Sequence, residues 1–187
     1  MNYAEKDNIP ALVWRGWSQE ALKAAGILGA ETRIFPCSSG MLDISVKMKE
    51  ELASIIEDIK PQAIITHWKN SIHPDHAAAH YNTIGAMSKA KMGKVPLFFS
   101  ENWEDSTEFN PDIAVRLEQE DFNAWLKAAE AFQFFREGFY NYPYRQYYKN
   151  LFFNRGAITR NGPYASVLMR HKYQGEFIKT ELPGTEA

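Results

Sequence analysis

The sequence contains a single cysteine, no long apolar run and no excess of basic residues. Cys37 has no second cysteine with which to form an internal disulfide, which fits a reducing compartment and predicts a cytoplasmic protein. No segment approaches the ~20 apolar residues that cross a bilayer, and the N-terminus lacks the charge order and apolar segment of a signal peptide. The formal net charge is −2. Nothing in this balance suggests the clustered Lys and Arg that bind nucleic acid or an acidic membrane surface. We therefore expect no nucleic acid and no membrane among its partners.

Length and composition are those of one globular domain. With 187 residues, of which 45% are apolar and 24% charged, the chain is long enough to bury a core and too short to favour two domains. We expect a single domain, 1–187, made of a βα core at 14–100, a long helix with an aromatic-rich region at 101–180, and a loose tail at 181–187.

The first hundred residues alternate between helical and strand patterns. Apolar residues recur at helical spacing in three segments, at about 18–28, 44–59 and 74–91. Ser18 is the expected N-cap of the first helix and Gly29 its end, and Pro74 is favoured in the first turn of the third. Short apolar runs predict strands at 32–35, 63–66 and 95–100. This order predicts an α/β fold with a parallel sheet and helices on its faces.

The second part of the chain has a different character. Residues 101–110 are polar and loop-like, and Asn110 with Pro111 indicates the start of a long helix that reaches about Arg136. Eight of the fifteen residues from Phe139 to Phe153 are Phe or Tyr. Within this segment Tyr142, Tyr144 and Arg145 suit a carbohydrate pocket, because sugar C–H faces stack on rings and hydroxyls accept hydrogen bonds. An oligomer interface or a core edge explains the same composition, since aromatic residues and Arg are enriched there too.

Histidines gather after the strand expected at 63–66. His73, His76 and His80 fall within eight residues, and His67 lies six residues before the first of them. Helical spacing places 73, 76 and 80 on one side of the helix, and imidazole is a common ligand of zinc-like ions. The pattern therefore predicts a divalent metal held in part by this turn. The alternative is that the turn only caps the helix, with Asp75 at the positive end of its dipole and His80 packed as an ordinary helix residue.

The stretch from Thr66-His67 to His73-Pro74-Asp75-His76 resembles the second signature of the PIG-L/LmbE family of zinc-dependent N-deacetylases, which remove acetyl groups from N-acetylglucosamine conjugates and related amides. Weaker similarities in the family's order extend from Arg15 to Phe135 and comprise 15–29, 35–42 and 112–113. The resemblance implies a Rossmann-like three-layer fold and a bound Zn²⁺ or another divalent transition metal. It also implies an N-acetylated sugar conjugate as the substrate.

The resemblance also implies roles for single residues. His76 is the implied metal ligand, His73 the residue that polarises the amide carbonyl or protonates the tetrahedral intermediate, and Asp75 the carboxylate that orients His73. His67 and His80 are possible additional ligands. Asn70 in the connecting loop is a candidate for contact with the substrate, together with the aromatic-segment residues Tyr142, Tyr144 and Arg145.

The family's first signature, Ala-His-Pro-Asp-Asp-Glu, which supplies further metal ligands and the general base, has no counterpart here, and the first forty residues contain no histidine. We therefore expect a sheet that lacks the family's first two strands. Residues 11–14, a second polypeptide, a swapped neighbouring copy or a rearranged sheet would fill the gap, so a homo-oligomer or a second chain is expected. Two functions stay open: a metal-dependent N-deacetylase, complete or in an incomplete or split form, or a non-catalytic binding or regulatory relative. A plain transition-metal site made by 73, 76 and 80 is a third interpretation.

Overall fold

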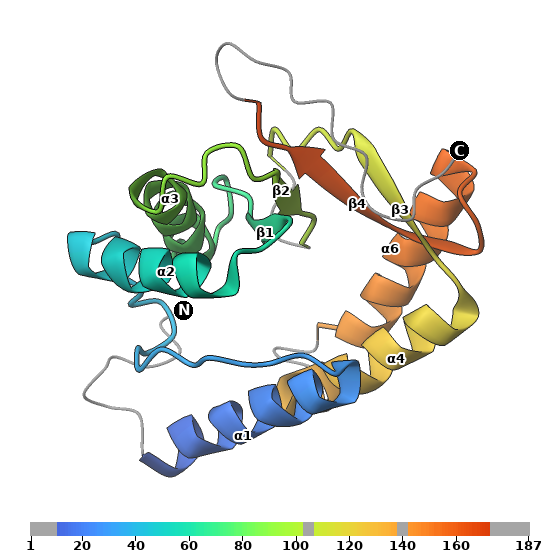
Figure 1. The fold of residues 1–187 in the computed structure, drawn as a ribbon. Helices are drawn as coiled ribbons and strands as arrows, with labels where there is room; N and C mark the ends of the chain where they lie inside the picture. Colours follow the sequence, from blue (N-terminus) through green and yellow to red (C-terminus); the bar gives the residue numbers. More distant parts are fainter. Residues whose placement is uncertain (1–10, 103–106, 138–141, 173–187) are drawn as a thin grey trace. The chain divides into compact units, whose positions relative to one another are not determined.

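The computed structural model describes residues 11–102, 107–137 and 142–172, and Figure 1 follows the chain through them. Contacts divide the chain into two compact units. One consists of Met1–Met41 and Ala114–Val167, and the other of Leu42–Ile113 and Leu168–Ala187. We call them the helical unit and the histidine unit. The expected tail at 181–187 lies outside the described residues. The single-domain organisation stays a prediction.

The histidine unit holds the βα part of the fold. In chain order it contains α2 (Val46–Ile59), β1 (Ile64–His67), α3 (Pro74–Lys89) and β2 (Leu97–Ser100). Helix α2 begins where the Ser45 hydroxyl accepts a hydrogen bond from the Met48 N–H, and α3 begins at the expected Pro74. These elements confirm the helices expected at 44–59 and 74–91 and the strands expected at 63–66 and 95–100.

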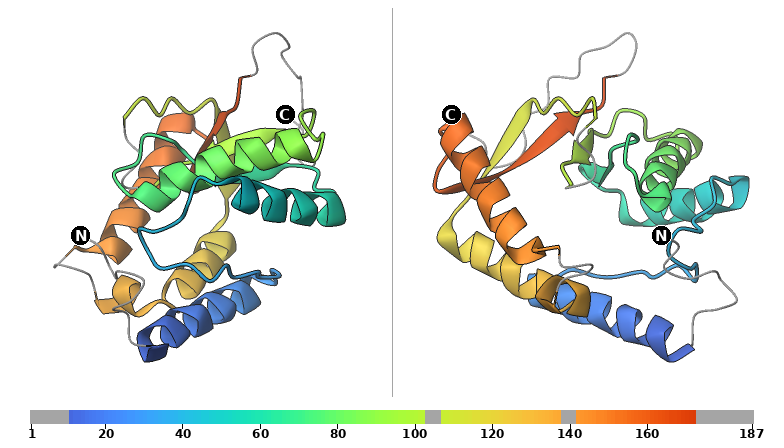
Figure 2. Two further views of the ribbon diagram at one scale, coloured as in Figure 1. Left: turned by 90° about the vertical axis from the view of Figure 1, so that its left-hand side faces the viewer. Right: turned by 180° about the vertical axis from the view of Figure 1, so that it is seen from behind.

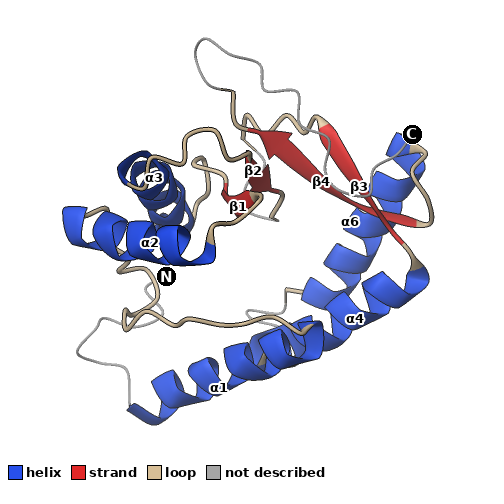
Figure 3. Cartoon of the chain, viewed as in Figure 1, coloured by secondary structure: helices blue, strands red, loops and turns tan. Residues whose placement is uncertain are grey.

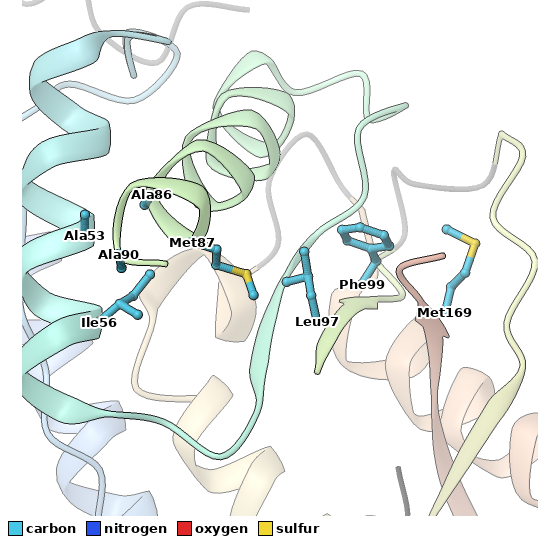
Figure 4. Packing of buried hydrophobic residues seen from close by; sticks show 8 residues of the cluster. All are labelled: Ala53, Ile56, Ala86, Met87, Ala90, Leu97, Phe99 and Met169. Atoms are coloured by element: carbon cyan, nitrogen blue, oxygen red, sulfur yellow. The ribbon is translucent and has the colours of Figure 1, made fainter. Parts of the chain in front are cut away.

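The core of the histidine unit is apolar and continuous across its layers. Figure 4 shows side chains from α2, α3, β2 and β4 (Tyr164–Arg170) in one cluster. Its most buried members are Ala86, Met87, Leu97 and Phe99. Burial of this kind contributes roughly 25 cal/mol per Å² of apolar surface. The packing fixes α3 against the sheet, and it therefore fixes the position of the loop that carries the histidines.

The sheet is mixed. Among the described residues the strand order is β1-β2-β4-β3, where β3 is Ile113–Leu117. Strands β1 and β2 run parallel with His67 opposite Ser100, whereas β2 and β4 run antiparallel. The parallel prediction therefore holds for β1 and β2, and the expectation of an all-parallel sheet is wrong. Because β1 pairs directly with β2, no gap separates these two strands (Figure 3).

The helical unit contains α1 (Ala11–Leu28), α4 (Gln119–Ala129), α5 (Gln133–Glu137) and α6 (Tyr144–Thr159), and α1 contacts α4 (Figure 2). Helix α1 ends as expected. Gly29 has φ of 67°, the Ala30 N–H donates to the Ala25 carbonyl at 2.9 Å and the Gly29 N–H to the Gly26 carbonyl at 3.4 Å.

Aromatic rings from three helices make the interior of the helical unit. Trp125 packs edge-on against Phe135 and Phe152, with ring centroids 5.8 and 4.7 Å apart, and lies 5.3 Å from the ring of Tyr148. Packing therefore accounts for much of the aromatic segment. None of the described helices combines the length and apolarity that a membrane span requires.

Three sequence-based expectations are wrong in the N-terminal part. Helix α1 begins at Ala11, so Ser18 lies inside the helix and residues 11–14 do not supply a strand. Residues 32–35 form no strand, and Ile34 in this segment is 41% exposed. A short apolar run predicts a strand only where a neighbouring strand accepts its hydrogen bonds, and Pro36 ends the run after four residues.

The long helix expected from Asn110 to Arg136 is wrong at its start and is interrupted. Residues 113–117 form β3, where β-branched Ile113 and Val115 favour a strand. Helix α4 then begins at a capping box in which Glu118 and Asp121 each accept a backbone hydrogen bond. Glu118 and Asp121 therefore cap the N-terminus of α4.

Candidate functional site

The histidines lie where the parallel strands end. His67 is the last residue of β1 and pairs with Ser100, the last residue of β2, so both carboxyl ends meet at one edge. The chain then runs through a short loop to α3, whose N-cap is His73. In α/β sheets this edge is where ligands bind, because loops and helix N-termini converge there.

Three imidazole rings come together at this edge. The rings of His67 and His76 are stacked with centroids 3.9 Å apart and planes 4° apart. The ring of His73 lies 5.0 Å from that of His76, with an angle of 28° between the planes. The structure thus brings together His67, His73 and His76, three of the four histidines that the sequence singles out.

Two polar side chains lie close to Nδ1 of the His76 ring. Its Nδ1 lies 2.9 Å from the Ser71 hydroxyl and 3.4 Å from the Asn102 side-chain nitrogen. The same Ser71 oxygen accepts the backbone N–H of His73 at 3.1 Å. Ser71 therefore links the two histidines.

His73 uses its ring to cap α3. Its Nδ1 accepts the Asp75 N–H at 3.3 Å, so a neutral His73 carries its proton on Nε2. The Asp75 carboxylate lies 3.9 Å from the same nitrogen, with both side chains about one-fifth exposed. The other Asp75 oxygen accepts the Leu42 N–H at 2.9 Å, which fixes the carboxylate. Asp75 is therefore placed to stabilise a positive charge on His73.

His80 is a core residue. It is 4% exposed, and its ring contacts those of Trp68, Tyr81 and Phe99. Its Nδ1 donates to the His67 carbonyl at 3.1 Å, which supports the end of β1. Burial lowers the pKa of His80 from its ordinary value of 6.5, and the nearby charges of His171 and Lys69 lower it further, while the hydrogen bond to the His67 carbonyl opposes these effects. This setting matches the packing interpretation of His80.

The described residues do not form a complete zinc site. Among them no group of three His, Cys, Asp or Glu side chains is arranged to hold a metal ion, and this includes His73, His76 and His80. Imidazole lone pairs lie in the ring plane, so the nearly parallel rings of His67 and His76 cannot point at one ion. Catalytic zinc sites usually have three protein ligands, and the described residues do not bring three together.

Asn70 braces the loop between β1 and α3. Its side-chain nitrogen donates to the Glu108 carboxylate at 2.8 Å, and the Trp68 indole N–H donates to the Thr107 carbonyl at 2.9 Å. These bonds hold the loop between β1 and α3 against the loop that precedes β3. Asn70 thus has a structural task in addition to its expected one.

The remaining predicted residues lie in the helical unit. Tyr142, Tyr144 and Arg145 line a cavity of about 750 Å³ there. The sequence analysis missed Ser71 and Asn102. Only weak sequence signals point to them. Ser71 is a hydroxyl residue two positions before His73, and Asn102 is a polar residue just after the end of β2.

Comparisons with known proteins agree with the sequence resemblance. Residues 8–87 match the family described as "PIG-L: GlcNAc-PI de-N-acetylase". This matched segment contains the stretch 66–76. A curated relative from Thermobifida fusca (strain YX), 1D-myo-inositol 2-acetamido-2-deoxy-alpha-D-glucopyranoside deacetylase, is 35% identical over 74 residues. That match covers 38% of this chain and spans only 26% of the relative. The resemblance to the PIG-L/LmbE family is confirmed.

Solved structures share the fold. GalB, the 4-carboxy-2-hydroxymuconate hydratase of Pseudomonas putida KT2440, aligns with a TM-score of 0.77 at 18% identity, over 94% of this chain and 78% of its own. The conserved protein TT1542 of Thermus thermophilus aligns with a TM-score of 0.70 at 22% identity, over 92% of this chain and 78% of its own. At these identities the likeness concerns the fold alone.

Proposed function

We propose, from the premise that residues 8–87 match the PIG-L family, that this protein is a metal-dependent hydrolase that removes an acetyl group from an N-acetylated sugar-like substrate. One observation carries the proposal. The family match includes a histidine pair whose rings lie 5.0 Å apart at the carboxyl end of a parallel strand, with a carboxylate 3.9 Å from His73. This is the setting in which an amide carbonyl can be polarised and its oxyanion stabilised.

His73 is the proposed electrophile. Its Nδ1 accepts the helix N–H, so its Nε2–H can donate to the carbonyl oxygen of the acetyl group. Negative charge develops on that oxygen as the amide carbon becomes tetrahedral, and the hydrogen bond strengthens at that point. To protonate the leaving nitrogen, His73 must first be an imidazolium with a proton on each nitrogen, and the ring becomes neutral when Nε2 gives up its proton. Asp75, 3.9 Å from Nδ1, stabilises that imidazolium.

His76 is the proposed metal ligand. Ser71 engages its Nδ1, and we propose Nε2 as the donor atom, as in metal-bound histidines whose other nitrogen is held by a protein group. A zinc-like ion in such enzymes polarises the carbonyl and lowers the pKa of bound water to about 7. Because we propose one metal ligand among the described residues, we propose that the other ligands and the general base come from a second polypeptide or another copy of this chain. The site would then be completed in a split or assembled form.

We propose that the polypeptide that supplies the other ligands joins the sheet at the edge of β1 opposite to β2. Among the described residues β2 is the strand that pairs with β1. Ile65 in β1 is 59% exposed, and Ile72 in the loop after it is 77% exposed. An unpaired strand edge with exposed apolar side chains favours the addition of another strand. A second polypeptide or another copy of this chain would supply it and extend the sheet in the Rossmann-like order. Light scattering after size-exclusion chromatography tests this step, because a stable monomer that is fully active contradicts it.

A non-catalytic binding or regulatory role is the second candidate. A specific observation favours it: the described residues form no group of three metal-ligating side chains. The similar fold of a hydratase also means that fold alone does not imply deacetylation. In this alternative the edge of the sheet that carries the histidines binds a ligand, or completes another subunit, and catalyses no reaction.

The experiment that separates the two measures metal content and deacetylation of an N-acetylglucosamine conjugate, with and without added Zn²⁺. We expect His76→Ala to lose bound metal and activity. We expect His73→Gln to keep the metal and lose about 10²–10³-fold in kcat, the cost of removing one oxyanion donor. His171→Gln is the matched control, because this histidine of the same unit packs against Phe99. Absence of metal and of activity in the unmodified protein favours the binding role.

A further inference from the structure

The helical unit contains a cavity that the histidine chemistry does not use. It has a volume of about 750 Å³ and lies between α4, α5, α6 and the start of β4. Small-molecule sites usually measure about 300–1,000 Å³ and combine apolar walls with a few polar groups. Both kinds of group are present here, so the lining indicates what the cavity would bind.

The floor and walls of the cavity are aromatic. Phe122 and Phe135 are buried at 3% and 5% exposure and form part of the lining. Phe122 stacks on Tyr164 with centroids 4.3 Å apart and planes 12° apart, while Tyr142 and Tyr144 meet edge-on at 4.6 Å. Such ring faces with hydroxyls at their edges suit the C–H faces and hydroxyls of a sugar ring.

The rim of the cavity is positively charged. Arg136, Arg145 and Lys149 line it, against one carboxylate, Glu137. Arg136 donates to the Ala131 carbonyl at 2.8 Å, and the Arg145 Nε lies 3.1 Å from the Glu130 carboxylate. Each guanidinium has five N–H donors, so these anchors order the side chains and use only part of their capacity. Ordered guanidinium groups are suited to bind phosphate or carboxylate in two-point fashion.

Lys149 is the strongest single indication of an anion. It lies on the exposed side of α6, and in the described part of the chain its ammonium takes part in no hydrogen bond or ion pair. The Glu137 carboxylate, by contrast, accepts from the Gln133 amide at 2.8 Å. Among the described residues, the lining therefore has a cation without a counter-charge beside an aromatic hollow.

We infer that this cavity binds a sugar that carries an anionic group, such as a hexose phosphate. The ring would lie against Tyr142 and Tyr144 and the anion at Lys149 and Arg145. The inference goes beyond the proposed function and rests on it only for the sugar-like nature of the ligand.

Titration of the full chain with α-D-glucose 1-phosphate tests the cavity, because this sugar has no amide that the proposed reaction could cleave. Binding is followed by calorimetry and by the NMR signals of tyrosine rings, with glucose and inorganic phosphate as separate ligands. We expect glucose 1-phosphate to bind more tightly than either, and Lys149→Gln to weaken it about tenfold by loss of one charge-assisted contact. Lys127→Gln, the same charge change on α4 outside the cavity lining, is the matched control and should bind as the unmodified protein does.

The outcomes separate this inference from the proposed function. Equal affinity for inorganic phosphate would mean that the cations act alone and would overturn the sugar part of the inference. No binding, or equal effects of Lys149→Gln and Lys127→Gln, would overturn the whole of it. Neither result depends on metal or on turnover, so deacetylation can fail while the cavity binds, and the reverse.

Discussion

Ser71 offers a sharp test of how the site is built, because one hydroxyl touches both catalytic candidates. It lies 2.9 Å from the His76 Nδ1 and accepts the His73 N–H at 3.1 Å. Ser71→Ala removes both contacts and leaves the rest of the loop in place. The change therefore tests whether the orientation of His76 matters, without altering any group proposed to meet the substrate.

Two sizes of effect follow for Ser71→Ala. Each lost hydrogen bond contributes about 1 kcal/mol, so the free energy of unfolding should fall by about 1–2 kcal/mol. If His76 holds a metal, loss of the group behind the ligand should cost about 10–100-fold in metal affinity and in kcat/KM. Ser71→Thr keeps the hydroxyl and should retain most of both.

The assay has a readout that needs neither metal nor substrate. Long-range ¹H–¹⁵N spectra report which nitrogen of His76 carries the proton, and Ser71→Ala should change that tautomer balance. Ser88→Ala, at an exposed serine of α3, is the matched control and should leave the His76 signals unchanged. Unchanged tautomer signals and unchanged kcat/KM in Ser71→Ala would refute the positioning role, whatever happened to stability.

Further predictions concern stability, pH and the role of Asp75. Gly156→Ala should destabilise the protein by about 1–3 kcal/mol, because the new Cβ would lie 2.7 Å from the Gly162 carbonyl oxygen. Gly85→Ala, whose three nearest Cβ neighbours all belong to the flexible Lys49 side chain, should cost less in the same thermal melts. Because burial lowers the pKa of His80 below 6.5, the unfolded chain binds more protons than the folded one, so stability should fall as pH drops through 6.5. His80→Gln should flatten that pH dependence in urea titrations, and an unchanged slope would contradict the buried-neutral assignment. Asp75→Asn should reduce kcat more than it raises KM, and an effect confined to KM would mean that Asp75 only helps to bind substrate.

The sequence predicted local order well where the pattern and the packing agree. The helices at 44–59 and 74–91 and the strands beside them are present, because their apolar periodicity matches a core that they share. The end of the first helix at Gly29 was also predictable, because a left-handed residue there is most readily glycine. What failed was the assignment of short apolar runs without a known partner: residues 32–35 form no strand, whereas 113–117 and 164–170 do.

The candidate site was half predictable for a related reason. Spacing along one helix predicted that His73 and His76 lie close together. It also suggested His80 as a companion, although that ring is buried among Trp68, Tyr81 and Phe99. Helical periodicity predicts which residues share one face of a helix, but it does not predict which other segments pack against that face. Core residues and site residues on the same face therefore have the same sequence pattern. Ser71 and Asn102 act through contacts between segments, which no local pattern reports.

The capping and catalytic interpretations of His73 are compatible, because an imidazole has two nitrogens. Nδ1 accepts the Asp75 N–H and starts α3, and this same bond keeps the proton of a neutral ring on Nε2. A histidine that only capped the helix could be replaced by Asn or Ser at little cost, since these are preferred N-caps. Replacement of His73 by Asn therefore separates the two tasks. It should preserve the thermal stability of the histidine unit and abolish deacetylation, whereas a variant that keeps both properties would leave His73 as a cap and nothing more.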